Sequence, residues 1–116
     1  MKVRLIMYDF SLISGEEVLD IFDNVWVKQG DNEKNTTIAL TNKRLLFLEY
    51  SKDDPNEVLR TARGLDYPRY KEVYYQIELT NISKVKESEN YSVILDNNTS
   101  FEFDDSHLFD LLKKNN

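Results

Sequence analysis

The sequence is poor in the residues on which most catalytic and metal sites depend. It has no cysteine and a single histidine, His107, among its 116 residues. The lack of cysteine excludes disulfides, thiolate metal sites and a cysteine nucleophile, and one histidine cannot form a multi-histidine metal site. The three glycines, at positions 15, 30 and 64, are too far apart for a glycine-rich phosphate-binding loop. We therefore expect no catalytic residue, metal, cofactor or small-molecule substrate.

Positive charge is also scarce, because 15 Lys and Arg stand against 21 Asp and Glu, giving a net charge of −6. Proteins that bind nucleic acid neutralise phosphates with Lys and Arg, so this balance argues against DNA or RNA. The sequence contains no apolar run near the roughly 18 residues that span a bilayer. Asp9 interrupts the apolar start of the chain, where a signal peptide needs a continuous apolar run. These features predict one cytoplasmic domain, residues 1–116.

What the sequence does contain is a series of short stretches in which apolar and polar residues alternate, the pattern of strands with one buried face. Residues 45–48 are apolar at every position, which predicts a strand buried on both faces at the centre of the fold. In the first stretch Asp23 interrupts the apolar parity shared by Ile21 and Val25. The pattern predicts seven strands, within residues 17–29, 36–40, 45–48, 71–79, 82–86, 91–95 and 101–103.

Two other segments have helical signals. Residues 54–64 begin with Asp-Pro and end with Gly, which predicts a short helix inserted between the third and fourth strands. Residues 106–114 carry a leucine stripe after a capping Asp105 or Ser106, which predicts a C-terminal helix. Residues 1–13 fit either a helix face or a strand face. We expect them to form an N-terminal extension that packs on its own domain or on a neighbouring chain.

Three strings occur in a particular order along the chain: GEEVL at 15–19, IALTNKRLLF at 38–47 and IELTNI at 77–82, before a closing hairpin and helix. In this the chain resembles the pleckstrin-homology-like superfold, and most of all the bacterial PH-like and GRAM-type domains. The resemblance covers residues 14–115. It implies a mainly β fold, a seven-stranded antiparallel β-barrel or sandwich capped by a C-terminal α-helix. Thr36 stands where these families often have a glycine.

The string at 41–44 predicts a tight hairpin turn. Asn42 can adopt a positive φ and bond its own backbone, and Thr41 can bond locally. Lys43 and Arg44 would then hold their charges in solvent, with their aliphatic stems along the sheet. Two interpretations stay open for this basic pair. It is either a hairpin signature with solubilising charges or a basic site for an anionic head group.

The resemblance also raises phosphoinositides as ligands, because the PH domains that bind them place several Lys and Arg in the first hairpin loop. The corresponding loop here, residues 30–34, contains two acids and one base. A polyanionic phosphate would be repelled about as strongly as it is attracted. The resemblance therefore implies the fold without this lipid site, and a membrane lipid is the disfavoured alternative.

One segment reverses the acidic balance. Residues 60–71 contain four basic residues and one acid, with tyrosines between them. Arg and Tyr are the side chains most enriched in binding hot spots. The segment is either a solvated surface, neutralised by acids at 53, 54 and 57, or a recognition patch for an acidic peptide, an acidic protein face or a second copy of the chain. The residues of the predicted partner site are Arg60, Arg63, Tyr67, Arg69, Tyr70 and Lys71.

An acidic cluster near the C-terminus, Glu102, Asp104 and Asp105, has the ligand chemistry of a divalent cation site. A helix cap that favours the helix dipole explains Asp104 and Asp105 better. No motif places a nucleophile beside a base. The sequence therefore predicts a non-catalytic PH-like module for protein–protein interaction or self-association. Peripheral binding to anionic lipid is the alternative.

Overall fold

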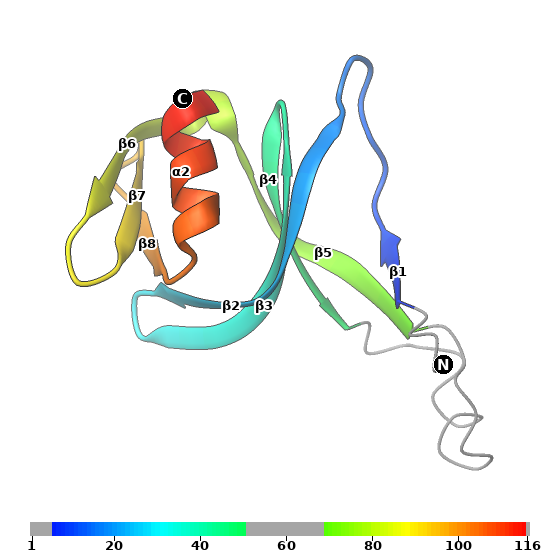
Figure 1. Cartoon of the computed structure of the whole chain (residues 1–116), viewed down its shortest axis with the longest axis horizontal. Coiled ribbons are helices and arrows are strands. Elements are labelled where there is room, and N and C mark those ends of the chain that lie inside the picture. Colours follow the sequence, from blue (N-terminus) through cyan, green and yellow to red (C-terminus); the bar gives the residue numbers. More distant parts are fainter. Residues whose placement is uncertain (1–5, 51–68, 116) are drawn as a thin grey trace, which may run out of the picture.

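The computed structural model describes residues 6–50 and 69–115. The helix expected over residues 54–64 lies outside the described residues. Figure 1 shows α2 lying against a strongly curved sheet, between β6–β8 and β2–β5. The elements are β1 (Ile6–Asp9), β2 (Val18–Gln29), β3 (Asn32–Thr41), β4 (Arg44–Tyr50), β5 (Arg69–Glu78), a 3-10 turn (Leu79–Asn81), β6 (Ile82–Glu87), β7 (Tyr91–Leu95), β8 (Ser100–Phe103) and α2 (Ser106–Asn115).

In the described part of the chain, eight strands form one sheet in the order β1-β5-β4-β3-β2-β8-β7-β6. Strands β2 to β8 pair antiparallel with their neighbours in this order. The seven-stranded antiparallel sheet with a C-terminal helix is thus confirmed. β1 adds an eighth strand, parallel to β5, with Ile6 opposite Arg69 and Asp9 opposite Glu72. The strand alternative therefore holds for residues 6–9 of the N-terminal extension.

The main core lies inside the curved sheet and is closed by α2. Phe47 meets Phe101 edge to face, with ring centroids 5.3 Å apart, and Tyr91 stacks on Phe109 at 4.4 Å. Aromatic pairs in these geometries add to the stabilisation that burial gives. Phe47, Phe101 and Phe103 are core residues, as alternation predicted. The buried core contains Phe22, Val25, Val27, Ile38, Leu40, Leu45, Phe47, Ile77, Leu79, Ile82, Val93, Leu95, Phe101, Phe103, Leu108, Phe109 and Leu112.

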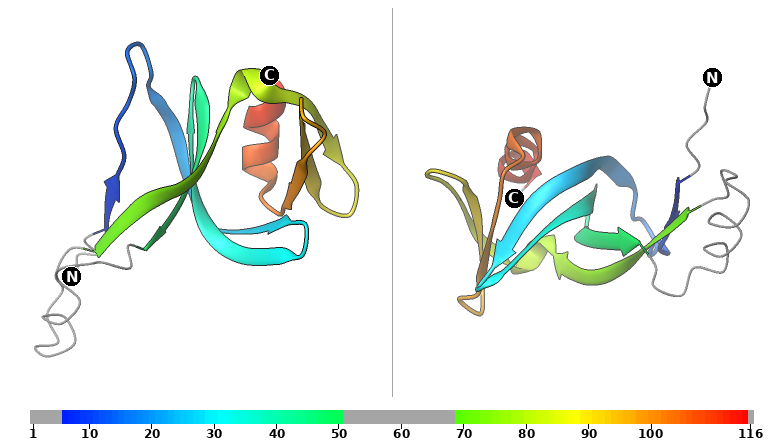
Figure 2. Two further views of the ribbon diagram at one scale, coloured as in Figure 1. Left: turned by 180° about the vertical axis from the view of Figure 1, so that it is seen from behind. Right: turned by 90° about the horizontal axis from the view of Figure 1, so that it is seen from below.

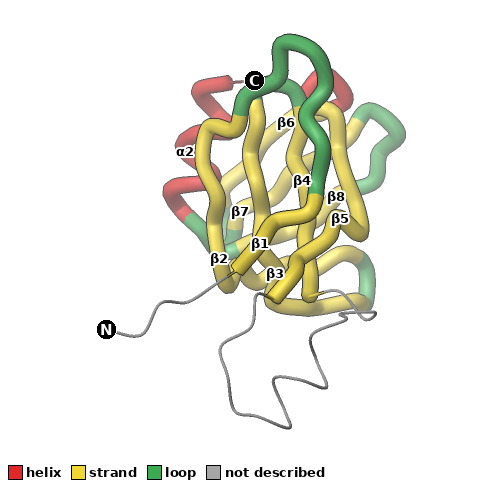
Figure 3. The backbone as a smooth tube through the Cα atoms, turned by 90° about the vertical axis from the view of Figure 1, so that its right-hand side faces the viewer, coloured by secondary structure: helices red, strands yellow, loops and turns green. Residues whose placement is uncertain are grey.

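A second, smaller apolar cluster lies on the outer face of the sheet. Ala39, Leu46 and Leu48 are fully buried there. Phe10 packs against them from the connection between β1 and β2, which we call the strap (residues 10–17). Figure 3 looks onto this side, with β1 and the strap in front of the sheet, and Figure 2 places β1 and α2 on opposite sides of β4. The prediction that residues 45–48 are buried on both faces is confirmed, and the strap is part of the reason.

The hairpin turns follow the predicted residues with one exception. Gly30 has a φ of +60° at the first of the two residues that join β2 to β3, where a type II′ turn takes glycine. Asn98 has a φ of +68° in the turn between β7 and β8. Asn42 does not adopt the expected positive φ. Its side chain bonds to the strap instead, which the local pattern of a hairpin could not reveal.

The entry to α2 confirms one predicted cap and corrects another. The Asp105 carboxylate accepts a hydrogen bond from the backbone N–H of Leu108 at 3.0 Å, so Asp105 caps the helix. Asp104 instead accepts from the backbone N–H of Trp26 at 3.0 Å and ties β2 to the helix entry. Trp26 is half-buried. Within residues 6–50 and 69–115, no three side chains gather as metal ligands, and no helix has the length and apolar character to cross a bilayer.

Candidate functional site

The β3–β4 turn is built around the hydroxyl of Thr41. Its Oγ1 accepts hydrogen bonds from the backbone N–H groups of Lys43, at 3.0 Å, and Arg44, at 2.8 Å. The predicted local bonding of Thr41 is confirmed. The hydroxyl also donates to Oε2 of Glu16 at 2.6 Å. The turn is therefore joined to the strap from its first residue.

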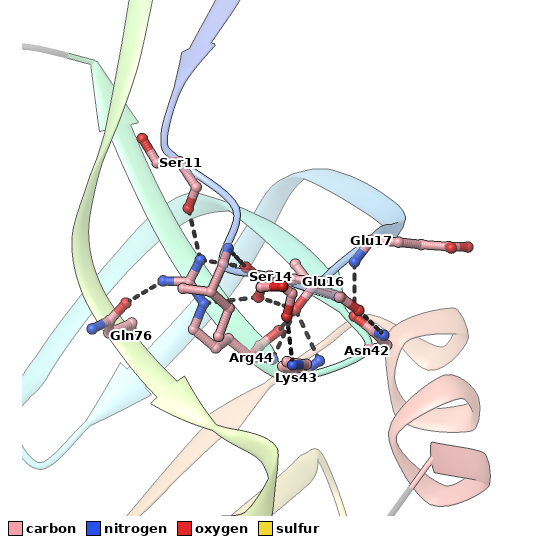
Figure 4. Close-up of polar contacts among 11 residues, drawn as sticks. Ser11, Ser14, Glu16, Glu17, Asn42, Lys43, Arg44 and Gln76 are labelled. Atoms are coloured by element: carbon pink, nitrogen blue, oxygen red, sulfur yellow. Dashed lines mark hydrogen bonds and ion pairs between the residues drawn. The ribbon is translucent and has the colours of Figure 1, made fainter.

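Glu16 and Arg44 form a buried, bidentate ion pair at this corner (Figure 4). Arg44 Nη2 donates to Oε1 at 2.6 Å and Nε donates to Oε2 at 2.8 Å, a geometry in which both bonds are charge-assisted. The Glu16 side chain is 0% exposed and that of Arg44 is 14% exposed. The hydrogen bond from Arg44 is the largest cause that lowers the pKa of Glu16 from 4.5 to about 2, with help from Thr41 and the backbone of Ile13 and against the effect of burial.

The rest of the turn also binds the strap backbone. Four bonds share this role: Asn42 Nδ2 to the Gly15 carbonyl at 3.0 Å, the Glu17 N–H to Asn42 Oδ1 at 2.8 Å, Lys43 Nζ to the Ser14 carbonyl at 2.8 Å and Arg44 Nη2 to the Ser11 carbonyl at 2.9 Å. We call this assembly of strap and turn the strap corner. Lys43 is exposed, as expected. The side chain of Arg44, which we expected to hold its charge in solvent, is mostly buried instead. Both cations therefore bind the strap, and this role accounts for their contacts.

Of the predicted basic segment, residues 60–71, only residues 69–71 lie within the described part of the chain. Arg60, Arg63 and Tyr67 lie outside the described residues. Arg69 and Tyr70 begin β5, with their backbones paired to Ile6 and Met7 of β1. Lys71 follows them, and its side chain is described in full. The structure thus brings the last three residues of the predicted site to the start of β5, on the edge next to β1.

Lys71 is a buried cation on the outer face of the sheet. Its side chain is 10% exposed, and Nζ donates to Thr37 Oγ1 at 2.6 Å and to Asp23 Oδ1 at 3.2 Å. Thr37 donates in turn to the same Asp23 oxygen at 2.9 Å. The ring of Tyr50 lies 4.8 Å from Nζ, which supplies a cation–π contact. Asp23 itself is 55% exposed, so the anion of this pair faces solvent.

These groups line a pocket of about 430 Å³, which we call the Lys71 pocket. A β-bulge between Phe22 and Val25 shapes one wall, where Asn24 has a φ of +58°. Asn adopts this φ more readily than most residues other than glycine, so it suits the bulge. The pocket is lined by Asp23, Asn24, Asn35, Thr36, Thr37, Leu48, Glu49, Tyr50 and Lys71.

A separate ion pair engages Glu49, another residue that lines the pocket. Lys34 Nζ lies 2.9 Å from Glu49 Oε2 and 4.1 Å from the centre of the Tyr74 ring. The hydrogen bond to Glu49 is the main cause that raises the pKa of Lys34. Tyr74 donates its hydroxyl proton to Thr36 at 3.1 Å. The Glu49 carboxylate is therefore already matched by a cation.

Sequence reasoning named Lys71 but missed the residues around it. Asp23 gave one signal, because it interrupts the apolar parity of β2 and the structure places a bulge there. Thr37 and Asn24 gave none, since isolated polar residues in a strand are ordinarily solvent-facing. The contact between Lys71 and Thr37 spans 34 residues, so no local pattern contains it.

Comparison with known proteins supports the fold. No family model and no curated protein matches the chain. Among solved structures it is similar to one described as the Vps36 N-terminal PH domain, with a TM-score of 0.54 and 13% sequence identity, over 90% of this chain and 82% of that one. At this identity the likeness shows the fold alone. The chain has a PH-like fold, as the strings at 15–19, 38–47 and 77–82 indicated.

Proposed function

We propose that the chain is a non-catalytic binding module that recognises an acidic protein surface, on a partner or on a second copy of itself. One observation carries the proposal: Lys71, a buried cation, lines a pocket of about 430 Å³ beside the start of β5. The arginines and tyrosines of segment 60–71 adjoin it in the sequence. Such residues are typical of binding hot spots. A rigid sheet presents this surface without chemistry.

The lipid alternative has less support. Arg44 already gives its donors to Glu16, Ser11 and Gln76, so an anionic head group at the β3–β4 turn would have to break a buried ion pair. We also propose that the chain is a bacterial domain of the GRAM type and that it is cytoplasmic. These points rest on the sequence strings and the composition.

The proposal is tested with a fluorescein-labelled peptide of glutamate and serine, whose binding is followed by fluorescence anisotropy. We expect saturable binding that weakens as salt rises. A variant with Arg63→Glu and Arg69→Glu should lose binding and keep the melting temperature. The matched control reverses two exposed lysines of β6, Lys84→Glu and Lys86→Glu, which changes the net charge equally.

Retained binding by the control together with loss in the arginine variant supports the proposal. Equal binding by both variants, or no binding of the wild-type chain at low salt, contradicts it. Sedimentation with phosphatidylserine vesicles at low salt, without peptide binding, would favour the lipid alternative instead.

A further inference from the structure

We infer that the Lys71 pocket takes a carboxylate of the acidic partner, and that Asp23 occupies the place of this carboxylate in the unbound protein. The inference rests on the proposed function, since it assumes an acidic partner. Beyond the proposed function, it names the atom that the partner contacts, Nζ of Lys71, and it identifies Asp23 as a competitor for that contact within the chain.

The first support is the unequal burial of the two charges. A buried ammonium group needs an anion or hydrogen-bond acceptors, because leaving it unpaired is costly. In the described part of the chain, Asp23 is the carboxylate within ion-pair distance of Lys71. It is mostly exposed, and its 3.2 Å separation is longer than the roughly 2.7–2.9 Å of a strong charge-assisted bond. The cation is fixed, and the anion is held weakly at the solvent side.

The second support is the backbone that carries Asp23. This residue lies in the bulge, and the ladder of β2 with β3 resumes on either side of it, at Phe22 opposite Ile38 and Val25 opposite Thr36. Asp23 can therefore turn away without breaking these cross-strand pairs. The hydrogen bonds that it accepts from Thr37 and Lys71 both end on the single oxygen Oδ1.

The third support is the chemistry left behind when Asp23 moves out. Thr37 Oγ1 can donate to an incoming carboxylate as it now donates to Asp23. Lys71 Nζ supplies the positive charge, and the polar residues Asn24 and Asn35 also line the pocket. Glu49 also lines it but is paired with Lys34 at 2.9 Å. The pocket thus offers one cation and several donors to one anion.

The test uses the same labelled glutamate–serine peptide and the whole chain. Asp23→Asn keeps the side-chain shape and removes the competing charge, so the peptide should bind about fivefold more tightly, the size of a modest exposed ion pair. Lys71→Gln should bind at least about tenfold more weakly, because it removes a charge-assisted contact. Asp31→Asn, in the exposed β2–β3 turn, removes the same charge as Asp23→Asn and should not change the affinity.

Two further measurements protect the test against misfolding of the Lys71 variant. Thr37→Val keeps the shape of a buried side chain and should weaken peptide binding severalfold. In the wild-type chain, the peptide should shift the backbone amide NMR signals of Asn24 and Thr37.

The outcomes separate the inference from the proposed function. The inference is supported if Asp23→Asn binds the peptide more tightly than the wild-type chain and Asp31→Asn does not. Peptide binding that is unchanged in Asp23→Asn, Lys71→Gln and Thr37→Val overturns it and leaves the proposed function standing. Weaker binding by Asp23→Asn also overturns it, because Asp23 would then be part of the site rather than its competitor. Failure of the wild-type chain to bind contradicts the proposed function itself.

Discussion

Two carboxylate–cation pairs lie on the outer face of the same sheet, and they differ in which partner is buried. At the strap corner, the Glu16 anion is 0% exposed and Arg44 surrounds it with two short bonds. In the Lys71 pocket the cation is the buried partner, and the Asp23 anion is 55% exposed. Both pairs join segments far apart in the sequence.

The difference predicts a structural ion pair at the strap corner and an exchangeable one in the Lys71 pocket. The Glu16 carboxylate also accepts from Thr41 and from the backbone of Ile13, so no incoming group could replace all these contacts at once. Asp23 has fewer contacts and borders a pocket. An anion from solvent can reach the place of Asp23 but not that of Glu16. We therefore use the burial of the anion, more than the ion-pair distance, to predict which of the two pairs a ligand can enter.

The largest effect should come from breaking the strap corner. Arg44→Met leaves the Glu16 carboxylate buried without its cation, and we expect the free energy of unfolding to fall by about 3 kcal/mol. Urea denaturation measures it. The double variant Glu16→Leu with Arg44→Met should lose less than Arg44→Met alone, since no buried charge is left unpaired. A loss below about 1 kcal/mol in Arg44→Met would show that the pair is not structural.

The pH dependence should be the next largest effect. The folded pKa of Glu16, about 2, lies below its ordinary value of 4.5, so folding favours the ionised form. Its contribution to stability is fully present above the ordinary pKa and is lost as the pH falls toward the folded pKa. Urea midpoints of the wild-type chain should therefore fall in this acid range more steeply than those of Glu16→Gln. If the urea midpoints of the two proteins fell in parallel as the pH was lowered, Glu16 would not be the source of this pH dependence.

A smaller effect is expected where the strap packs on the outer apolar cluster. Phe10 is half-buried against Ala39, Leu46 and Leu48. We expect Phe10→Ala to lower the free energy of unfolding by about 2 kcal/mol, less than for a fully buried phenylalanine. Leu12→Ala, at a strap position that is 47% exposed, is the control and should change it by less than about 0.5 kcal/mol. Equal losses would mean that Phe10 contributes little packing.

The smallest effect should come from the exposed anion. Asp23→Asn removes an exposed anion, while buried Lys71 keeps Thr37 Oγ1 and the new amide oxygen as hydrogen-bond acceptors, so we expect a loss below about 1 kcal/mol. Urea denaturation next to Arg44→Met gives the comparison directly. If Asp23→Asn were as destabilising as Arg44→Met, Asp23 would be a structural counter-ion and the contrast between the two pairs would fail.

Much of the sheet could be predicted because its strands follow from patterns among residues that are close together in the sequence. Alternation at Phe101 and Phe103 gave a buried face, and the uniformly apolar run at 45–48 gave a strand buried on two faces. The Asp105 cap of α2 was also visible in the sequence. Each of these features depends on residues within a few positions of one another, where the periods of strands and helices apply.

The strap corner and the Lys71 pocket depend on distant contacts, and the sequence predicted them less well. Arg44 was expected in solvent, since its acceptor Glu16 is 28 residues away. Asn42 was expected to bond locally, and it bonds the strap instead. Lys71 was named for its charge, but its burial depends on Thr37 from another strand. The two strings at 15–19 and 38–47 are in fact the two halves of one hydrogen-bonded corner.

The strap also has a consequence for where this domain begins. A fragment cut at residue 14, where the family resemblance starts, would lack β1 and Phe10. β5 would then lose its pairing with β1 and become an edge strand, and the apolar cluster at Ala39, Leu46 and Leu48 would lose part of its cover. Unpaired strand edges beside exposed apolar side chains template intermolecular pairing. We therefore expect a chain without residues 6–13 to aggregate more readily than the whole chain.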